Sequence, residues 1–357
     1  MAVVTIVGAG MMGAAMCWPL ADRGHTVRLV GTPLDEDIIG SIRATGVHPR
    51  LERAIPAGVE SFLAAELSQA LQGAELIVGG ISSFGVDWFA ETTGPHFRPE
   101  IPVLSVTKGL EDRPDGSLEI LPAALDRRLP AGLRGRISFN AIGGPCIAHE
   151  LAARRQTAIV FTGSDGAILE RLRSMLETPY YHIWTSTDVT GVEACAALKN
   201  AYAMGVGLAV GMMEAAGADG LANLYNPQAA LFGQSCYEMT RLVRLMGGDP
   251  ANLTWLPGPG DLYVTVFGGR TVRLGKLLGQ GIPFSEARRI LAGVTLESVE
   301  ITTRVARALP KLAARGLVDL ADFPLLLHLD RILNQGEPVN IPWQAFFRSP
   351  YAVQIGQ

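Results

Sequence analysis

The stretch VVTIVGAGMMG, residues 3–13, decides the fold of this 357-residue chain. Its first five residues are apolar or β-branched and predict a buried strand. Gly8, Gly10 and Gly13 follow with the spacing G-x-G-x-x-G, and a stretch of helical character runs on to Gly24, which we expect to end the helix. In such a unit the first glycine permits the tight turn, the second lets the backbone approach a pyrophosphate, and the third lets the helix pack on the strand. The motif therefore predicts a dinucleotide-binding domain.

The same alternation continues through the first half of the chain. We expect further strands, separated by helical stretches, at residues 26–30, 76–81, 103–107, 137–142 and 158–161. Strands that alternate with helices predict βαβ units and an α/β fold with a mostly parallel, doubly wound sheet of the Rossmann type. Pro19 lies inside the first helical stretch and should kink it, because proline removes one backbone hydrogen bond.

The pattern changes after about residue 188. From Gly191 to Gly247 the chain is rich in Ala, Leu and Met at helical spacing, and the signals for strands disappear. A length of 357 residues also favours two domains. We predict an NAD(P)-binding Rossmann domain over residues 1–188 and an all-helical substrate or catalytic domain over residues 189–357.

The composition narrows the classes of protein. Hydrophobic residues make up 48% of the chain and charged residues 18%, which is enough apolar material for two packed cores and excludes a disordered chain. The formal net charge of −4 gives no long-range attraction to nucleic acid or to acidic membranes. No apolar run approaches the roughly 20 residues that span a bilayer. We therefore expect a cytoplasmic protein that binds small molecules and contacts neither nucleic acid nor the membrane interior.

The cysteines and histidines give no sign of a metal site. Cys17, Cys146, Cys195 and Cys236 show no C-x-x-C spacing and do not cluster with the six histidines. This pattern predicts reduced thiols. His48 lies in a proline-bearing loop, and we expect a structural histidine there.

The choice between NAD and NADP stays open. The backbone of Met11 and Met12, at the predicted helix start, should face the phosphates. An acid at the end of the second strand would hydrogen-bond the adenosine ribose. This chain has Thr32 near that point, which could serve either cofactor, and Asp35 and Glu36 come only later.

Lysines are rare in this chain, which makes their positions informative. Of the 30 basic residues only four are lysines: Lys108, Lys199, Lys276 and Lys311. A desolvated lysine can lose its proton, whereas arginine effectively cannot. Lys199 lies in a small, apolar helical stretch and suits proton transfer to a carbonyl oxygen, although a lysine that extends from a buried helix to solvent is the alternative. Lys108 follows a predicted strand at its carboxyl end, where ligands bind in open α/β sheets.

Two segments of the second half carry further candidate residues. Asp261 follows the rigid turn Pro257-Gly258-Pro259-Gly260 and either caps the next helix or holds Lys199 and a substrate hydroxyl. Arg270 follows Gly268-Gly269, and we expect it on a flexible loop that suits bidentate contact with a phosphate. An exposed loop arginine without a ligand is the alternative.

These segments, in this order, resemble the glycerol-3-phosphate dehydrogenase family, and most closely its archaeal-type branch. The stretches that carry the resemblance are GAGMMGAA at 8–15, GTPLDEDI at 31–38, HPRL at 48–51, SVTKGL at 105–110, GPCIAHELA at 144–152, GVEACAALKNAYAMGVG at 191–207 and GPGDLYVTVFGGRT at 258–271. The resemblance implies an oxidoreductase that interconverts sn-glycerol 3-phosphate and dihydroxyacetone phosphate with NAD(P)(H). It also allows a homodimer.

The resemblance also implies roles for individual residues. Lys199 would be the proton donor and acceptor, while Lys108 and Asp261 would orient the substrate. The expected substrate-binding residues are Lys108, Gly144, Cys146, Asn200, Thr265, Gly269, Arg270 and Thr271. The expected cofactor-binding residues are Gly8, Gly10, Met11, Met12, Gly13, Thr32, Lys108, Ala148, Arg270 and Glu297.

Several positions depart from the family's usual residues. Thr271 stands where asparagine is usual, Cys146 where serine or asparagine is usual, and Ile301 where threonine is usual. Leu224-Tyr225-Asn226 replaces the common Gly-Asp-Asn. These departures keep two alternatives open: a longer polyol phosphate such as a four-carbon one, or a 2-hydroxyacid or ketopantoate-type reduction on the same two-domain plan. A cofactor sensor without catalysis is disfavoured, because it would have no reason to keep a proton donor.

Overall fold

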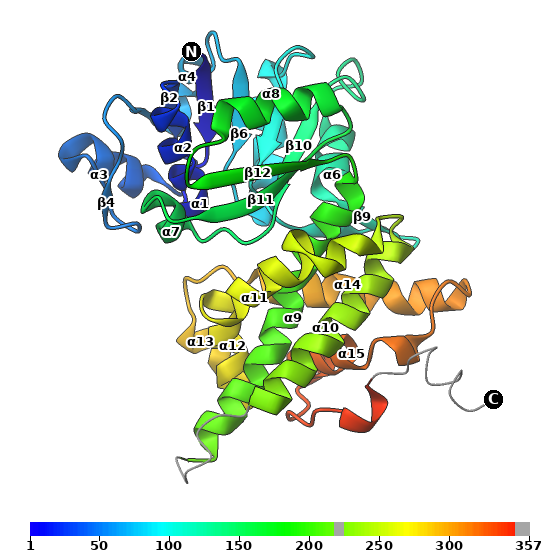
Figure 1. Ribbon diagram of the computed structural model, residues 1–357. Coiled ribbons are helices and arrows are strands. Elements are labelled where there is room, and N and C mark those ends of the chain that lie inside the picture. The colour runs from blue at the N-terminus through cyan, green and yellow to red at the C-terminus, as the bar shows by residue number, and fades with distance from the viewer. Residues whose placement is uncertain (218–224, 347–357) are drawn as a thin grey trace. The chain divides into compact units, whose positions relative to one another are not determined.

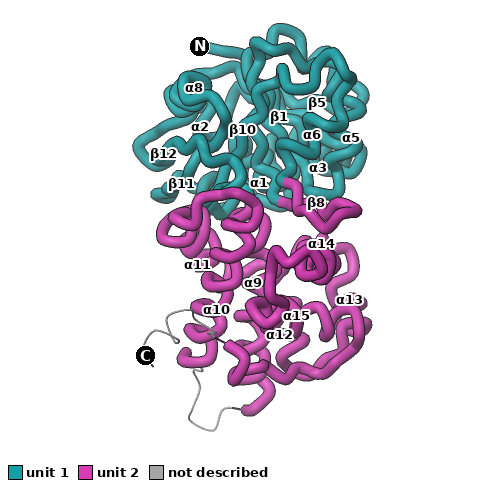
Figure 2. The backbone as a smooth tube through the Cα atoms, turned by 90° about the vertical axis from the view of Figure 1, so that its right-hand side faces the viewer, with its two compact units in different colours: residues 1–108, 120–193 teal, residues 109–119, 194–357 magenta. Residues whose placement is uncertain are grey.

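The computed structural model describes residues 1–217 and 225–346, and Leu224 lies outside this part of the chain. The chain divides into two compact units (Figure 2). Unit 1 comprises residues 1–108 and 120–193, and unit 2 comprises residues 109–119 and 194–357. The domain boundary at 188/189 stays a prediction, and the two units are described separately below.

Unit 1 is built around one sheet of eight strands (Figure 1). Its order is β12-β11-β10-β7-β6-β1-β2-β5, and its neighbours run parallel except for the antiparallel pair β10 and β11. The strands are β1 (Val3–Val7), β2 (Thr26–Val30), β5 (Glu60–Phe62), β6 (Leu76–Gly79), β7 (Val103–Ser105), β10 (Phe139–Gly143), β11 (Thr157–Thr162) and β12 (Tyr181–Ser186). The predicted doubly wound, mostly parallel sheet is confirmed.

Helices bury both faces of this sheet. Successive side chains of a strand point to opposite faces, and those of β1 and β6 enter two different hydrophobic clusters: Val4, Ile6, Leu76 and Val78 in one, Val7 and Ile77 in the other. The first cluster is closed by α1 (Met11–Ala15), α2 (Cys17–Asp22), α3 (Glu36–Thr45), α7 (Ala148–Ala152) and α8 (Gly166–Leu176). The second is closed by α4 (Leu67–Ala70), α5 (Val86–Thr93) and α6 (Leu121–Arg128).

The first helical stretch is interrupted, as the proline predicts. Helix α1 ends at Ala15 and α2 begins at Cys17, so that Pro19 lies in the first turn of α2, where a missing N–H is tolerated. Gly24 follows α2 with a φ of +76°, a conformation that favours glycine at a helix end.

Unit 2 is predominantly helical, which confirms the predicted helical second half. Its helices are α9 (Val189–Ala215, whose first residues belong to unit 1), α10 (Tyr225–Leu245), α11 (Asp261–Val266), α12 (Arg270–Gly279), α13 (Phe284–Ile290), α14 (Glu297–Ala314) and α15 (Pro324–Asp330). Within residues 1–217 and 225–346, no helix is both long and apolar enough to cross a membrane.

A hairpin from the first half of the chain also belongs to unit 2. Strands β8 (Leu110–Asp112) and β9 (Leu118–Ile120) pair with each other, and β8 packs on α14. Arg307 Nη2 donates to Asp112 Oδ1 at 2.8 Å, and Arg315 Nη1 donates to the Asp115 carbonyl at 3.1 Å. These contacts attach the segment that directly follows Lys108 to the helical unit.

A buried carboxylate connects three helices of unit 2. Glu238 on α10 accepts hydrogen bonds from Tyr202 Oη on α9 at 3.0 Å, from Gln234 Nε2 at 2.8 Å, and from the backbone N–H groups of Leu325 and Leu326 at 2.8 and 3.0 Å. The two N–H groups lie in the first turn of α15, where backbone donors lack partners within the helix. Burial raises the pKa of Glu238 to about 7.

Helices α9 and α12 cross at glycines, so that their backbones lie close together. A Cβ atom at Gly275 would lie 2.2 Å from the Met204 carbonyl oxygen, and one at Gly279 would lie 2.1 Å from that of Leu208. On the facing helix, a Cβ atom at Gly211 would lie 2.0 Å from the Lys276 carbonyl oxygen. This close crossing fixes the position of α12, and therefore of Arg270 at its start, relative to α9.

We expect Gly275→Ala to destabilise the protein by about 2 kcal/mol or more, because the new methyl group overlaps rigid backbone. Thermal unfolding should show a Tm lower by several degrees. Gly40→Ala is the matched control: Gly40 lies in α3, and a Cβ atom there meets nothing within 4 Å. Because alanine favours helix, this control should leave the Tm unchanged or raise it. An equal Tm for both variants would contradict the close crossing.

Candidate active site

In unit 1 the predicted residues gather at one edge of the sheet. Strands β1, β6, β7 and β10 are parallel, so their carboxyl ends lie at the same edge. The glycine loop follows β1, Lys108 follows β7, and Gly144 and Cys146 follow β10. The chain order reverses between β1 and β6, which is where open α/β sheets bind ligands.

The glycine loop is packed on one side and open on the other. Gly8 has a φ of +114°, and a Cβ atom there would lie 2.5 Å from the Gly80 carbonyl carbon. A Cβ atom at Gly13 would lie 2.2 Å from the Gly8 carbonyl oxygen. At Gly10, by contrast, the nearest atom would be 4.0 Å away. Gly8 and Gly13 therefore serve packing, while Gly10 leaves room for a ligand to approach the backbone, as a dinucleotide phosphate requires.

Gly80 packs against this loop, and sequence reasoning missed it. It follows β6, and a Cβ atom there would lie 2.7 Å from the Gly13 Cα atom and 2.8 Å from the Gly8 carbonyl oxygen. The signal was present in the sequence, because two adjacent glycines, Gly79 and Gly80, lie near the end of the strand predicted at residues 76–81.

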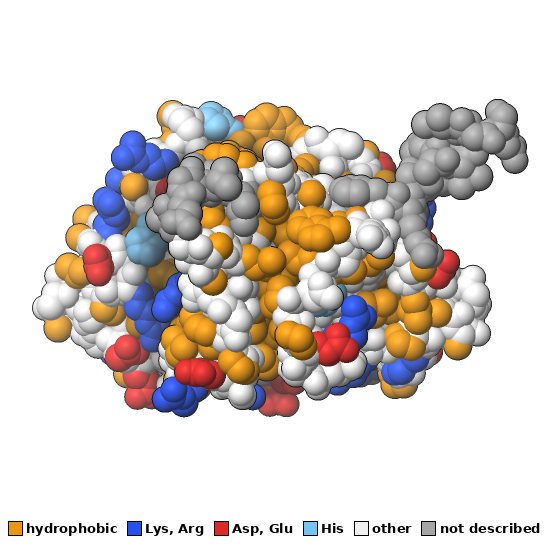
Figure 3. Space-filling model, turned by 90° about the horizontal axis from the view of Figure 1, so that it is seen from below, with side chains coloured by type: hydrophobic (Ala, Val, Ile, Leu, Met, Phe, Trp, Pro, Cys, Tyr) orange, Lys and Arg blue, Asp and Glu red, His pale blue; other side chains and the backbone are white. Residues whose placement is uncertain are grey.

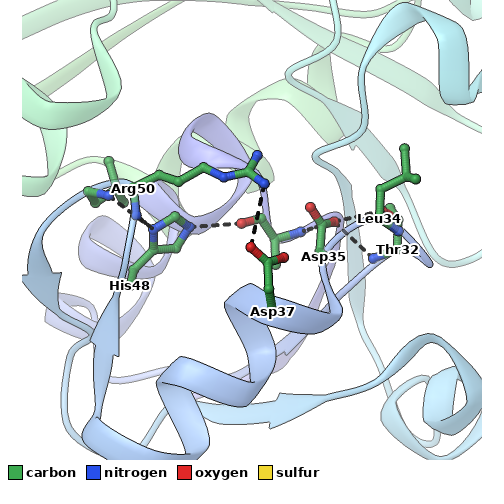
Figure 4. Close-up of polar contacts among 8 residues, drawn as sticks. Thr32, Leu34, Asp35, Asp37, His48 and Arg50 are labelled. Atoms are coloured by element: carbon green, nitrogen blue, oxygen red, sulfur yellow. Dashed lines mark hydrogen bonds and ion pairs between the residues drawn. The ribbon is translucent and has the colours of Figure 1, made fainter. Parts of the chain in front are cut away.

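The end of β2 is organised by Asp35. Its Oδ2 atom accepts hydrogen bonds from Thr32 N at 2.9 Å, from Thr32 Oγ1 at 2.7 Å and from Ala9 N at 3.2 Å (Figure 4). Asp35 is also buried, with only 7% of its surface exposed. The acid that seemed to come too late in the sequence thus connects the end of β2 to the glycine loop. The contact of Thr32 with the cofactor stays a prediction.

Lys108 has an acidic neighbour that sequence reasoning also missed. Glu193, near the start of α9, is 1% exposed, and neither of its carboxylate oxygens has a hydrogen-bond partner among the described residues. Burial raises the pKa of Glu193 to about 8, and the positive charge of Lys108 opposes that rise. The available signal was a glutamate in the otherwise apolar stretch Gly-Val-Glu-Ala-Cys at 191–195.

This buried acid makes stability depend on pH. Because the folded-state pKa of about 8 lies above the ordinary value of 4.5, the folded protein holds this proton more tightly than the unfolded chain. The resulting stabilisation is present in full below about pH 4.5 and is lost as the pH rises through about 8. We expect Glu193→Gln to flatten the pH dependence of the free energy of unfolding between about pH 5 and pH 9, measured by urea denaturation. Glu91→Gln, at an exposed position of α5, should leave that slope as in the wild type.

The remaining candidates of unit 1 lie after β10. Gly144 has a φ of +114°, and Ala148 is the first residue of α7. Cys146 lies between them and is partly buried against the hydrophobic cluster of α1 and α7. These positions are compatible with the roles that the sequence predicts, which stay predictions.

In unit 2, Lys199 and Asp261 form a buried ion pair. Lys199 Nζ contacts Asp261 Oδ1, and the two side chains are 10% and 0% exposed. Lys199 therefore does not reach from a buried helix to bulk solvent. Asn200, the next residue of α9, is also buried. A lysine held this way in an apolar helix–helix contact is oriented by its partner and has little water around it.

The turn before α11 positions Asp261 next to Lys199. A single π-helical turn, Leu256–Gly260, contains Pro257 and Pro259 and leads directly into α11. The capping alternative for Asp261 is wrong, because Gly260 is the N-cap residue and Asp261 is the first residue of the helix. Thr265 Oγ1 donates to the Asp261 carbonyl at 2.7 Å, one turn further along α11.

Arg270 lies at a helix start, which corrects the expectation of a flexible loop. Gly269, with a φ of +91°, is the N-cap of α12, and Arg270 is its first residue. Arg270 Nη2 lies 3.2 Å from Oε2 of Glu297, and Glu297 is the first residue of α14. The Arg270 and Glu297 side chains are 45% and 21% exposed. A half-exposed pair of this kind contributes little stability, so an anionic ligand can compete for the guanidinium. The unpaired N–H groups at the start of α12 add a second attraction for an anion.

Comparison with known proteins identifies the family to which this chain belongs. Residues 3–168 match the model for the N-terminus of NAD-dependent glycerol-3-phosphate dehydrogenase, and residues 188–343 match the model for its C-terminus. The NADP(+)-dependent glycerol-3-phosphate dehydrogenase of Archaeoglobus fulgidus is 34% identical over 337 residues, which cover 94% of this chain and 96% of that protein. The chain belongs to the NAD-dependent glycerol-3-phosphate dehydrogenase family. The predicted NAD(P)-dependent oxidoreductase acting on a CH–OH group is thereby confirmed.

Solved structures agree with this family. The glycerol-3-phosphate dehydrogenase of Coxiella burnetii is 26% identical, with a TM-score of 0.79, and the match covers 99% of this chain and 98% of that one. A ketopantoate reductase from Ralstonia eutropha shares the fold at 16% identity and a TM-score of 0.54, over 93% and 98% of the two chains. The latter likeness concerns the fold alone.

The departures from the family pattern have different surroundings. Thr271, in the first turn of α12, is 8% exposed, and Ile301 on α14 is 2% exposed, so both side chains face packed surroundings. Tyr225, at the start of α10, is 67% exposed. Of these departures, Thr271 and Cys146 are also predicted substrate-binding residues, so a comparison of substrates should test their effect.

Proposed function

We propose that this protein interconverts sn-glycerol 3-phosphate and dihydroxyacetone phosphate, with NAD or NADP as the hydride carrier. The observation that carries the proposal is the buried Lys199–Asp261 pair, within a chain that belongs to the glycerol-3-phosphate dehydrogenase family. Ketone reduction needs one proton at the oxygen as well as one hydride at the carbon. Lys199 is the group placed to supply and reclaim that proton.

In this proposal the hydride and the proton come from different groups. A nicotinamide cofactor, held at the glycine loop of residues 8–13, would supply or accept the hydride. In the direction of reduction, Lys199 donates a proton from Nζ to the carbonyl oxygen, and the product hydroxyl keeps it. Asp261 holds Nζ in one orientation and stabilises its charged form. In the reverse direction Lys199 takes the proton from the hydroxyl, and solvent restores its starting state.

The substrate phosphate is assigned to Arg270 and the start of α12. The guanidinium offers paired N–H donors, and the backbone N–H groups of the first helical turn point in the direction of an approaching anion. Thr271, Gly269, Thr265 and Asn200 are proposed to line this pocket. Lys108 is proposed to orient the substrate, and Gly144 and Cys146 are proposed to bind it. Ala148 and Glu297 are proposed to contact the cofactor.

The test is a comparison of substrates with the purified full-length protein. Oxidation of NADH and of NADPH is followed with dihydroxyacetone phosphate, unphosphorylated dihydroxyacetone, erythrulose phosphate and ketopantoate. We expect turnover of dihydroxyacetone phosphate far above that of the unphosphorylated ketone. A preference for erythrulose phosphate would assign the longer substrate and implicate Thr271 and Cys146. Turnover of ketopantoate alone would overturn the proposal.

We propose in addition that the protein acts in the cytoplasm, as a homodimer, and without nucleic acid partners. The net charge of −4 disfavours binding to a polyanion. Hydrophobic side chains gather across the middle of the face shown in Figure 3, which is the type of surface that a second copy can cover. Light scattering of the purified protein should give twice the mass of the 38.0 kDa chain, and a monomer mass would overturn the dimer.

A further inference from the structure

The peptide groups on both sides of Ala9 are held by side chains from outside the glycine motif. The Ala9 N–H donates to Asp35 Oδ2 at 3.2 Å, and the Ala9 carbonyl lies 2.9 Å from His48 Nε2 (Figure 4). Ala9 is the residue between the packing glycine Gly8 and the open glycine Gly10. These two contacts therefore act on the middle of the predicted phosphate-binding loop.

The protonation of His48 follows from its contacts. His48 ends the short strand β3 (Val47–His48), which pairs with β4 (Arg53–Ala54), and its side chain is fully buried. Its Nδ1 atom accepts hydrogen bonds from the backbone N–H groups of Arg50 and Leu51, at 3.2 and 3.1 Å. The ring is therefore the tautomer with its proton on Nε2, and Nε2–H donates to the Ala9 carbonyl. Burial lowers the pKa of His48, which favours this neutral form.

The hydrogen bond from His48 fixes more than one atom of the loop. The peptide bond between Ala9 and Gly10 is trans and planar, so its N–H points opposite to its C=O. When His48 holds the Ala9 carbonyl, the Gly10 N–H is turned to the other side. At Gly10 a Cβ atom would find nothing closer than 4.0 Å, so no other segment packs tightly against the Cα of this residue, and a ligand can approach the backbone there.

We propose that His48, together with Asp35, is a positioning residue for the dinucleotide cofactor: it holds the Ala9 peptide so that the Gly10 N–H faces the pyrophosphate. The proposal rests on the proposed function, because it assumes that NAD(P) binds at this loop. It assigns a role in cofactor affinity to a hairpin, residues 47–54, that lies outside the Rossmann strand–turn–helix unit. His48 itself does not contact the reacting atoms.

The charged groups around this histidine do not replace its role. Arg50 and Asp35 act on His48 electrostatically with opposite signs. Arg50 Nη2 lies 3.8 Å from Asp37 Oδ2, with both side chains more than half exposed (Figure 4). The Arg50 guanidinium thus lies beside Asp37, while the Ala9 carbonyl receives its hydrogen bond from His48 Nε2.

Two isosteric substitutions separate positioning from folding. Asparagine places an amide oxygen near the position of Nδ1, so His48→Asn keeps the acceptor for the Arg50 and Leu51 N–H groups but removes the donor to Ala9. Glutamine reaches the position of Nε2, so His48→Gln can restore that donor. Binding of NADH and of NADPH is measured by fluorescence titration of the purified full-length protein, and kcat and KM are measured in parallel. His182→Gln is the matched control: His182 lies on β12, away from the glycine loop in the sequence, and its Nε2 atom lies 2.6 Å from Gln156 Oε1.

We expect His48→Asn to weaken cofactor binding about tenfold or more, with kcat at saturating cofactor close to that of the wild type. His48→Gln should recover most of the affinity, and His182→Gln should leave it unchanged. Wild-type affinity in a folded His48→Asn variant would overturn the proposal. A lower Tm without any change in cofactor affinity would overturn it as well, because it would show a purely structural histidine. Failure of the wild-type protein to bind either cofactor would instead refute the proposed function.

Discussion

Replacement of Lys199 with alanine is expected to reduce kcat by about 10³-fold or more, with cofactor affinity close to that of the wild type. General acid–base catalysis of this kind contributes roughly 10² to 10⁴ in rate, and Lys199 is the proposed proton donor. The cofactor phosphates are assigned to the glycine loop of unit 1, which this substitution does not touch. The measurements are steady-state turnover and fluorescence titration with NADH and NADPH.

The controls for Lys199 must separate chemistry from folding. Removal of the lysine leaves Asp261 as a fully buried carboxylate without its partner, which destabilises the fold. Lys199→Met retains most of the side-chain volume, and Asp261→Asn in the same chain removes the unpaired charge. This double variant should regain stability but not turnover. Lys276→Ala, which breaks only the exposed pair with Glu214 on the neighbouring helix, should keep full activity. Wild-type turnover in any folded Lys199 variant would disprove its role.

Arg270→Ala is expected to raise the KM for dihydroxyacetone phosphate by roughly 10- to 100-fold, which corresponds to the loss of a charge-assisted hydrogen bond to phosphate. The KM for unphosphorylated dihydroxyacetone should change little, because that ketone offers nothing for the guanidinium to bind. The phosphorylated and unphosphorylated substrates are compared under the same conditions at low salt, since added salt screens exposed charges.

Two further variants make the Arg270 result specific. Arg273→Ala removes a guanidinium from an exposed position of the same helix, one turn further on, and should leave both KM values unchanged. Glu297→Gln releases Arg270 from its ion pair and should lower the KM for the phosphorylated substrate or leave it unchanged. Equal losses on phosphorylated and unphosphorylated ketones in Arg270→Ala would contradict phosphate binding by this residue.

The sequence by itself determined the features that depend on neighbouring residues. The glycine spacing after Val7, the alternation of strands and helices, and the helical second half follow from local patterns, and the structure confirms them. The interruption of the first helix is also local, because Pro19 acts on its own turn. The candidate residues Lys199, Asp261 and Arg270 could be selected because each is a charged residue next to apolar, proline-rich or glycine-rich sequence.

The short strand β5 and the strand β12 were not predicted. Glu60-Ser61-Phe62 is short and largely polar, and it becomes a strand because it pairs with β2 at the edge of the sheet. In β12 Tyr181 and Ile183 are buried and Trp184 is exposed, and the pairing of β12 with β11 completes the other edge of the sheet. In both cases backbone hydrogen bonds to a distant segment, and not local propensity, decide the conformation.

Only the tertiary structure decided which distant residues meet. Asp261 pairs with Lys199 across 62 positions of sequence, and His48 reaches Ala9 across 39. Glu193 could be recognised as unusual, but its influence on Lys108 appears only when α9 lies near the end of β7. The physical reason is the same for each. Burial and the direction of a hydrogen bond depend on atoms from several chain segments, whereas spacing and propensity are properties of one segment.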